Sequence, residues 1–120
     1  MTIGQLFENI PTHLAVDDIT TLTATASNLA SSFVSAIDLS GASGSVAFTL
    51  DDGTDVGQIK IIYAKTEPAG SYSANINVDS WGYSSTSGTE IVLDSQGEAV
   101  ICIWDGSLWY PISVFGATVQ

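Results

Sequence analysis

The sequence predicts an all-β domain, an antiparallel sandwich or barrel-like sheet with an extended N-terminal arm. Short strand-like runs recur along the chain and are separated by clusters of Gly, Asp and Ser. No long amphipathic helical pattern lies between these runs, which argues against βαβ units. Hydrophobic residues make up 45% of the 120 residues and charged residues only 12%. This composition is typical of a single folded domain rather than a disordered chain.

The predicted strands are runs in which β-branched or aromatic residues recur at every second position. The run 58–64 differs, because it is apolar on both faces. The stretch 27–36 could instead form a short helix, since its Ala and Leu content is ambiguous. Asp105 and Gly106 favour a tight hairpin turn between the last two runs. The predicted strands are 19–25, 33–39, 45–50, 58–64, 72–78, 90–93, 99–104 and 108–114.

The N-terminal region, residues 1–16, is predicted to be an arm, and residues 17–120 the β domain. Pro11 would stop a helix that began near Gly4. The arm nevertheless carries apolar side chains that need cover, so it packs either on its own domain or on a neighbouring protein. We expect it to be the main attachment to a partner. The residues that would make this contact are Ile3, Leu6, Phe7, Ile10 and Leu14.

The charge of the chain excludes several classes of partner. Thirteen acidic residues face only two basic ones, Lys60 and Lys65, and the formal net charge is -11. Such a surface would repel nucleic acid and anionic membranes. The longest apolar run, 99–104, is far too short to cross a bilayer. The first residues lack the pattern of a secretory signal, so we expect the protein to stay in a cytoplasm until assembly.

No residue pattern in the sequence indicates an enzyme, a cofactor or a metal centre. The one histidine, His13, lies in the predicted arm, and Cys102 lies within an apolar strand pattern, where it is expected to be a small buried hydrophobe. The acidic turn Asp51–Asp52–Gly53–Thr54–Asp55 resembles part of a calcium loop but lacks the distal glutamate. A plain β-turn is the favoured interpretation, although aspartates near a trimer axis could share a cation.

Two groups of aromatic residues are candidates for contacts. Trp104, Trp109 and Tyr110 flank the predicted hairpin turn, and we assign them to the core or a subunit interface. Trp81 and Tyr83 lie in a Gly/Ser-rich segment, where stacking on a sugar ring and packing in the core are about equally plausible. A small sheet without disulfides gains stability by sharing its core, so a homo-oligomer, most simply a trimer, is expected.

The segment from about residue 52 to 112 resembles small structural proteins of tailed bacteriophages, especially capsid decoration (cement) proteins and related tail modules. The residues that carry the resemblance are the runs DDGTDVGQIKII and IVLDSQGEAVICIWDGSLWYPI. It implies a homotrimer on the outer surface of the capsid, with the arm reaching across the major capsid protein lattice.

The first hypothesis from the sequence is therefore a non-enzymatic virion protein that decorates and stabilises a capsid. Binding to the assembled shell and not to its dissociated subunits would stabilise the shell by mass action. The alternative is a phage tail-fibre or baseplate tip, or a carbohydrate-binding module, that recognises a host glycan through Trp81 and Tyr83.

Overall fold

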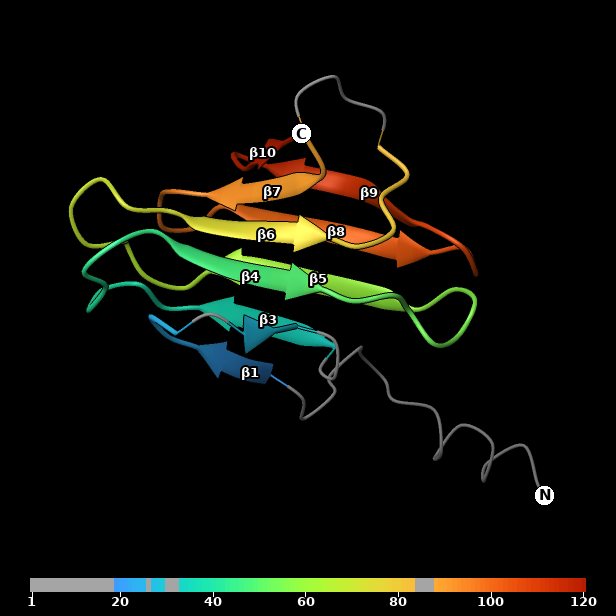
Figure 1. Cartoon of the computed structure of the whole chain (residues 1–120), viewed down its shortest axis with the longest axis horizontal. Helices are drawn as coiled ribbons and strands as arrows, with labels where there is room; N and C mark the ends of the chain where they lie inside the picture. Colours follow the sequence, from blue (N-terminus) through green and yellow to red (C-terminus); the bar gives the residue numbers. More distant parts are fainter. Residues whose placement is uncertain (1–18, 26, 30–32, 84–87) are drawn as a thin grey trace, which may run out of the picture.

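The computed structural model describes residues 19–25, 27–29, 33–83 and 88–120, and these form a sandwich of two five-stranded sheets (Figure 1). The predicted all-β class is confirmed. The predicted arm, with His13 and its five apolar anchors, lies outside the described residues. Sheet A has the strand order β1 (Ile19–Leu22), β3 (Val34–Ile37), β5 (Ile59–Ala64), β8 (Ala99–Trp104) and β9 (Trp109–Phe115). Sheet B has the order β10 (Thr118–Val119), β7 (Glu90–Leu93), β6 (Ala74–Val78), β4 (Val46–Leu50) and β2 (Ser27–Asn28).

The strand pairing is mixed, which corrects the expectation of a purely antiparallel arrangement. The first six strands alternate between the two sheets, so strands that are neighbours in one sheet are separated by a strand in the other. After each strand the chain crosses to the other sheet, and when it comes back to the first sheet it runs in its original direction. The strands β1, β3 and β5 are therefore parallel, and so are β2, β4 and β6. Only the pairs formed by β7, β8, β9 and β10 are antiparallel.

The helix considered for residues 27–36 is not formed in the part of that stretch the structure describes. Ser27 and Asn28 pair with β4, and β3 pairs with both β1 and β5. β-Branched residues on β3 pack well in the middle of a sheet, and this tertiary pairing outweighs a modest local helix preference.

The core lies between the sheets and is built largely from every second residue of β4, β5, β6, β7 and β8. Phe48 and Leu50 from β4 meet Ile62 from β5, and all three are almost completely buried. Lys60 also points inward from β5, where its ammonium group donates a hydrogen bond to the Leu29 carbonyl oxygen. The buried lysine thereby ties the segment after β2 to sheet A.

The predicted hairpin between β8 and β9 exists, but its turn is longer than a two-residue turn. Only Gly106 has a positive φ angle, +102°. The Asp105 carboxylate accepts hydrogen bonds from the backbone N–H groups of Ser107 and Leu108, both at 2.8 Å. These bonds lower the pKa of Asp105, the Leu108 contact most strongly. An aspartate side chain therefore closes the turn in place of a second residue with positive φ.

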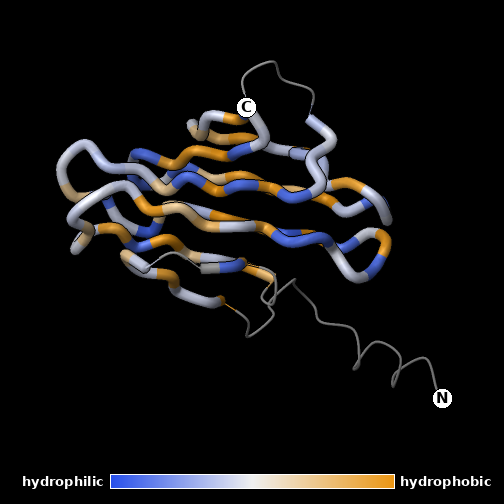
Figure 2. The backbone as a smooth tube through the Cα atoms, viewed as in Figure 1, coloured by the Kyte–Doolittle hydropathy of each residue, from blue (hydrophilic) through white to orange (hydrophobic). Residues whose placement is uncertain are grey.

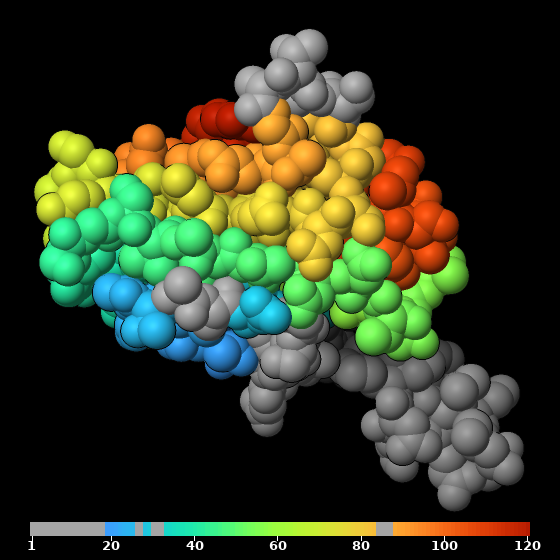
Figure 3. Space-filling model, viewed as in Figure 1, coloured from blue at the N-terminus to red at the C-terminus, as the bar shows by residue number. Residues whose placement is uncertain are grey.

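The two outer faces of the sandwich differ in character. On sheet B the outward positions of β4 and β6 carry Thr49, Asn75 and Asn77, and the tube drawn in Figure 2 alternates accordingly along these strands. The same strands lie side by side as a continuous surface in Figure 3. On sheet A the outward positions of β5 and β8 are apolar, as expected for the run that is strand-like on both faces.

Candidate functional site

One end of the sandwich gathers the loops that carry most of the candidate residues. The parallel strands β4 and β6 both end there, and the chain turns there from β8 into β9. In Figure 1 this is the end at which the arrows of β4, β6 and β8 point. The connections 51–58, 79–89 and 105–108 therefore lie next to one another, apart from residues 84–87, which lie outside the described part of the chain.

Trp104 and Trp109 form the buried base of this end. Their ring centroids are 5.4 Å apart and their planes are inclined by 56°. The Trp109 indole N–H donates to the Asp51 carbonyl oxygen at 2.8 Å, which connects β9 to the end of β4. A Cβ atom on Gly53 would lie 2.3 Å from the Trp104 ring, so the loop after β4 packs directly on that ring. Both tryptophans are part of the core of this chain.

The segment after β6 is held against the start of β9 by backbone hydrogen bonds. The Trp109 N–H donates to the Ser80 carbonyl oxygen and the Gly82 N–H donates to the Trp109 carbonyl oxygen, each at 2.8 Å. The Trp81 indole N–H donates to the Gln120 carbonyl oxygen at 2.8 Å. These bonds fix both the backbone and the ring of Trp81 at the rim of the sandwich.

Three aromatic side chains, Trp81, Tyr83 and Tyr110, meet around Gly82, and we call them the aromatic ledge. The Trp81 and Tyr83 ring centroids are 6.3 Å apart, with planes inclined by 48°. The Tyr110 ring covers Gly82 so closely that a Cβ there would lie 2.4 Å from a ring carbon. Tyr83 is 44% exposed and Tyr110 38% exposed. Tyr110 is thus not a core residue, because β9 turns it to the outer side of sheet A, opposite Ile103.

Two carboxylates lie at the ends of the strands beside this ledge. Asp51 follows β4 and Asp79 follows β6, and the Asp79 N–H donates to the Leu50 carbonyl oxygen at 3.1 Å, which continues the pairing of these parallel strands. Asn28 donates to the Asp51 carboxylate at 3.1 Å. Desolvation and the neighbouring Asp51 raise the pKa of Asp79. The end of sheet B therefore presents hydrogen-bond acceptors, and Asp79 stands two residues before Trp81 in the chain.

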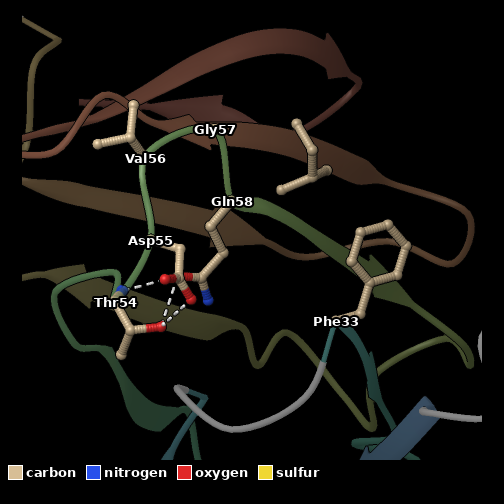
Figure 4. A pocket seen from close by; sticks show the side chains of 7 residues that line it. Phe33, Thr54, Asp55, Val56, Gly57 and Gln58 are labelled. Carbon is tan, nitrogen blue, oxygen red and sulfur yellow. Dashed lines mark hydrogen bonds between the residues drawn. The ribbon is translucent and has the colours of Figure 1, made fainter.

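The acidic turn that resembles part of a calcium loop is ordered by hydrogen bonds among polar groups of its own loop. No group of three or more His, Cys, Asp or Glu side chains among the described residues is placed to hold a metal ion. Instead, Thr54 and Gln58 line an open depression with Phe33 and Val56 (Figure 4). The Thr54 N–H donates to the Gln58 side-chain oxygen at 2.7 Å, and the Thr54 hydroxyl bonds to Asp55. These polar groups serve to order the loop.

The remaining candidate for chemistry among the described residues is Cys102, and it has a structural role. Cys102 is fully buried on the inner face of β8, and this burial raises the pKa of its thiol to about 12. A thiol with such a pKa is almost entirely protonated near neutral pH and is a poor nucleophile.

The described part of the chain contains no helix that is long and apolar enough to span a membrane.

The sequence identified Trp81 and Tyr83 but assigned neither Tyr110 nor the carboxylates to the same site. Tyr110 is adjacent to the ledge only because residues 80–82 pair with Trp109, a contact between segments far apart in the chain. Asp51 and Asp79 come together because β4 and β6 are parallel. In the sequence, the feature that could have identified these two aspartates is that each directly follows an apolar strand pattern.

Comparison with known proteins gives one informative match. No curated protein sequence is significantly similar to this chain. A family model described as the phage depolymerase C-terminal beta sandwich domain matches residues 18–110, well over half of the chain, and its name agrees with the observed sandwich. The chain therefore belongs to the family of phage depolymerase C-terminal beta sandwich domains, and so to the structural proteins of bacteriophages.

Proposed function

We propose that this domain is a non-catalytic module of a phage tail protein that binds a glycan of the host surface at the aromatic ledge. The observation that carries the proposal is the cluster of Trp81, Tyr83 and Tyr110 around Gly82, with two tyrosines exposed on a rigid backbone. The family supports a tail location, since its description names a phage depolymerase. A depolymerase acts on a polymer, and a surface glycan is the bacterial polymer that a phage meets first.

The chemistry of the ledge suits a sugar. An aromatic ring offers a flat apolar surface on which the C–H groups of a pyranose can pack. The neighbouring Asp51 and Asp79 carboxylates can accept hydrogen bonds from sugar hydroxyl groups. Sites of this type combine aromatic surfaces with a few convergent polar groups. Because those polar groups are acidic and the protein carries a net charge of -11, a neutral glycan is favoured over an acidic one.

Rigid support of the rings strengthens this proposal. Trp81 is held by its bond to the Gln120 carbonyl, and Tyr110 is braced by the backbone of Gly82. A side chain that is already ordered loses little conformational entropy when a ligand binds. Trp81, which is partly buried against the core, and the more exposed Tyr110 are thus ordered before a ligand binds.

The test is a titration of the protein with oligosaccharides released from the surface glycans of the host bacterium. We expect a change in tryptophan fluorescence that disappears in Trp81→Phe. The substitutions Tyr83→Ala and Tyr110→Ala should each weaken binding at least tenfold, which corresponds to about 1.4 kcal/mol. Phe115→Ala is the matched control, because Phe115 is an aromatic residue 73% exposed at the other end of β9.

Equal glycan binding by the tyrosine variants and the wild type would show that the ledge is not the binding site.

Capsid decoration, the first hypothesis from the sequence, has less support, because the matching family is described by a depolymerase. A co-sedimentation assay separates the two functions. A decoration protein should sediment with undecorated capsids whether or not the ledge is intact, whereas a tail module should not sediment with them.

A further inference from the structure

The outer face of sheet A is apolar across its central strands. Cross-strand register aligns Ile61 with both Val34 and Ile101 in one row that spans β3, β5 and β8, and it aligns Ile59 with Ile103 in the next row. These side chains are half-buried and do not belong to the core between the sheets. We call this surface the A face. It comprises Val34, Ile59, Ile61, Tyr63, Ala99, Ile101 and Ile103.

The fold itself does not require these apolar residues. The equivalent outward positions of sheet B are more polar, because Thr49, Asn75, Asn77 and Glu90 accompany Ala47 and Val92 there, and that sheet is built with the same strand geometry. In a sandwich, polar residues normally alternate with the inward apolar ones along each strand. Two adjacent strands of one sheet, β5 and β8, depart from this alternation. A contiguous apolar patch of this kind marks an interaction surface.

The distribution of charge indicates which partner fits the A face. The strands of sheet A contain a single charged residue, Lys60, and it points inward. The acidic residues of the described chain lie instead in the loops and on sheet B. Two copies of a protein with a net charge of -11 repel each other through most of their surfaces. They can approach most closely where no carboxylate is present, which is the A face.

The β9 edge of sheet A, opposite the β1 edge, is less suited to association than the face of the sheet. Pro111 removes one of the backbone donors of β9. The pairing of β8 with β9 also shifts register between Ile101 and Cys102, which leaves Ile112 as an extra residue in a bulge. Proline and bulges are common means of preventing edge-to-edge pairing. Association through the face does not need these backbone groups.

We propose that the A face is the surface through which copies of this chain associate. Strands of about six residues, rising about 3.3 Å per residue and lying about 4.8 Å apart, give a three-stranded face of roughly 300 Å² in projection. Two such faces would bury on the order of 600 Å², which is in the range of weak, transient contacts. The association is therefore a concentration-dependent equilibrium rather than a permanent assembly. The proposal does not rest on glycan binding, although Tyr110 of the ledge borders the A face at Ile103.

The test compares two charge substitutions on opposite faces of the sandwich. Ile101→Glu places a carboxylate in the centre of the A face, and Val92→Glu places one on the outer face of β7 in sheet B. Both original residues are half-buried, apolar and located within a strand. Sedimentation velocity should show the wild type and Val92→Glu associating as concentration rises, and Ile101→Glu remaining a monomer. Tyr63→Glu, at another place on the A face, should reproduce that result if Ile101→Glu fails to fold.

Two outcomes would overturn the proposal. One is a wild type that remains monomeric up to about millimolar concentration, and the other is a folded Ile101→Glu or Tyr63→Glu variant that still associates. Deletion of residues 2–16 tests whether this segment of the same chain, rather than a second copy, covers the A face. If that segment covers the A face within the same chain, the wild type should be monomeric and the truncated protein should associate, which also refutes the proposal. Circular dichroism verifies that each variant is folded.

Discussion

At the scale of single residues, Gly82 determines whether the aromatic ledge can form. The Tyr110 ring occupies the space that a Cβ atom at this position would need, at 2.4 Å from its nearest ring carbon. Real Cβ atoms do not approach so closely, and the ring, which lies beside Ile103 across the strand pair, would have to move. Glycine is thus required here by a close approach of a side chain to the backbone rather than by an unusual φ angle.

Gly82→Ala should therefore weaken glycan binding about tenfold, a loss of about 1.4 kcal/mol, by displacing Tyr110 from the ledge. Isothermal titration calorimetry with the same oligosaccharides measures the change. Gly44→Ala is the control, because a Cβ at Gly44 would meet no atom within 4 Å. If both variants bind as the wild type does, the position of Tyr110 does not matter to the site.

Asp79 provides a second prediction at this scale, one that depends on pH. Desolvation and the Asp51 carboxylate raise its pKa in the folded protein. A raised pKa means that the native state favours the protonated form, so this residue lowers stability as pH rises through its folded pKa. Asp79→Asn should consequently raise the melting temperature at about pH 7, and the advantage should vanish at about pH 3, where Asp79 is protonated in both states.

Thermal denaturation followed by circular dichroism at the two pH values measures this effect. Asp94→Asn, an exposed carboxylate after β7 at the other end of the sandwich, is the control and should change little at either pH. An equal stabilisation by Asp79→Asn at both pH values would show that the raised pKa of Asp79 is not the cause of the stabilisation.

At the scale of elements, β9 connects the core, the ledge and the free edge of sheet A. Its first residue, Trp109, is 1% exposed, packs on Trp104 and bonds to the Asp51 carbonyl. Its second residue, Tyr110, belongs to the ledge, and the strand ends at Phe115, just before Gly116, whose φ of +73° lets the chain turn toward sheet B. A single strand therefore couples stability to the geometry of the site.

Trp109→Ala should lower the free energy of unfolding by about 3–5 kcal/mol, since it removes a large buried ring and leaves a cavity. It also leaves the Asp51 carbonyl without its indole donor. Urea denaturation measures the change. Phe115→Ala on the same strand, at an exposed position, should stay within about 0.5 kcal/mol of the wild type. A Trp109→Ala protein that unfolds like the wild type would contradict the placement of this ring in the core.

At the scale of the whole molecule, net charge and the A face oppose each other. A charge of -11 on a 12.5 kDa chain disfavours any contact between copies, whereas the uncharged A face favours one. Salt separates these effects, because it screens repulsion between exposed carboxylates and does not weaken apolar burial.

Self-association should accordingly become several times stronger when sodium chloride is raised from about 0.05 M to about 0.5 M. Sedimentation equilibrium at the two salt concentrations gives the association constants, and Val92→Glu should show the same trend as the wild type. An association that weakens with salt would indicate ion pairs at the interface, which the A face does not offer.

The sequence by itself determined the all-β class, the composition of the core and the unusual two-sided character of 58–64. A period of two along a strand reports directly which residues face inward, and Val46, Phe48 and Leu50 show this pattern without reference to any other segment. Net charge and composition likewise follow from the sequence without knowledge of the fold, because they are sums over residues.

Only the tertiary structure decided which strands are neighbours, and with them the ledge and the A face. The connections 38–45, 51–58 and 65–73 are longer than the roughly two to five residues of most hairpin loops, so each can return in the same sheet or cross to the other one. The entropic cost of closing a loop rises slowly with its length. The local sequence therefore does not decide whether a connection returns in the same sheet or crosses to the other sheet. Packing of both sheets on one core makes that choice, and it brings Asp51 beside Asp79 and Tyr110 over Gly82.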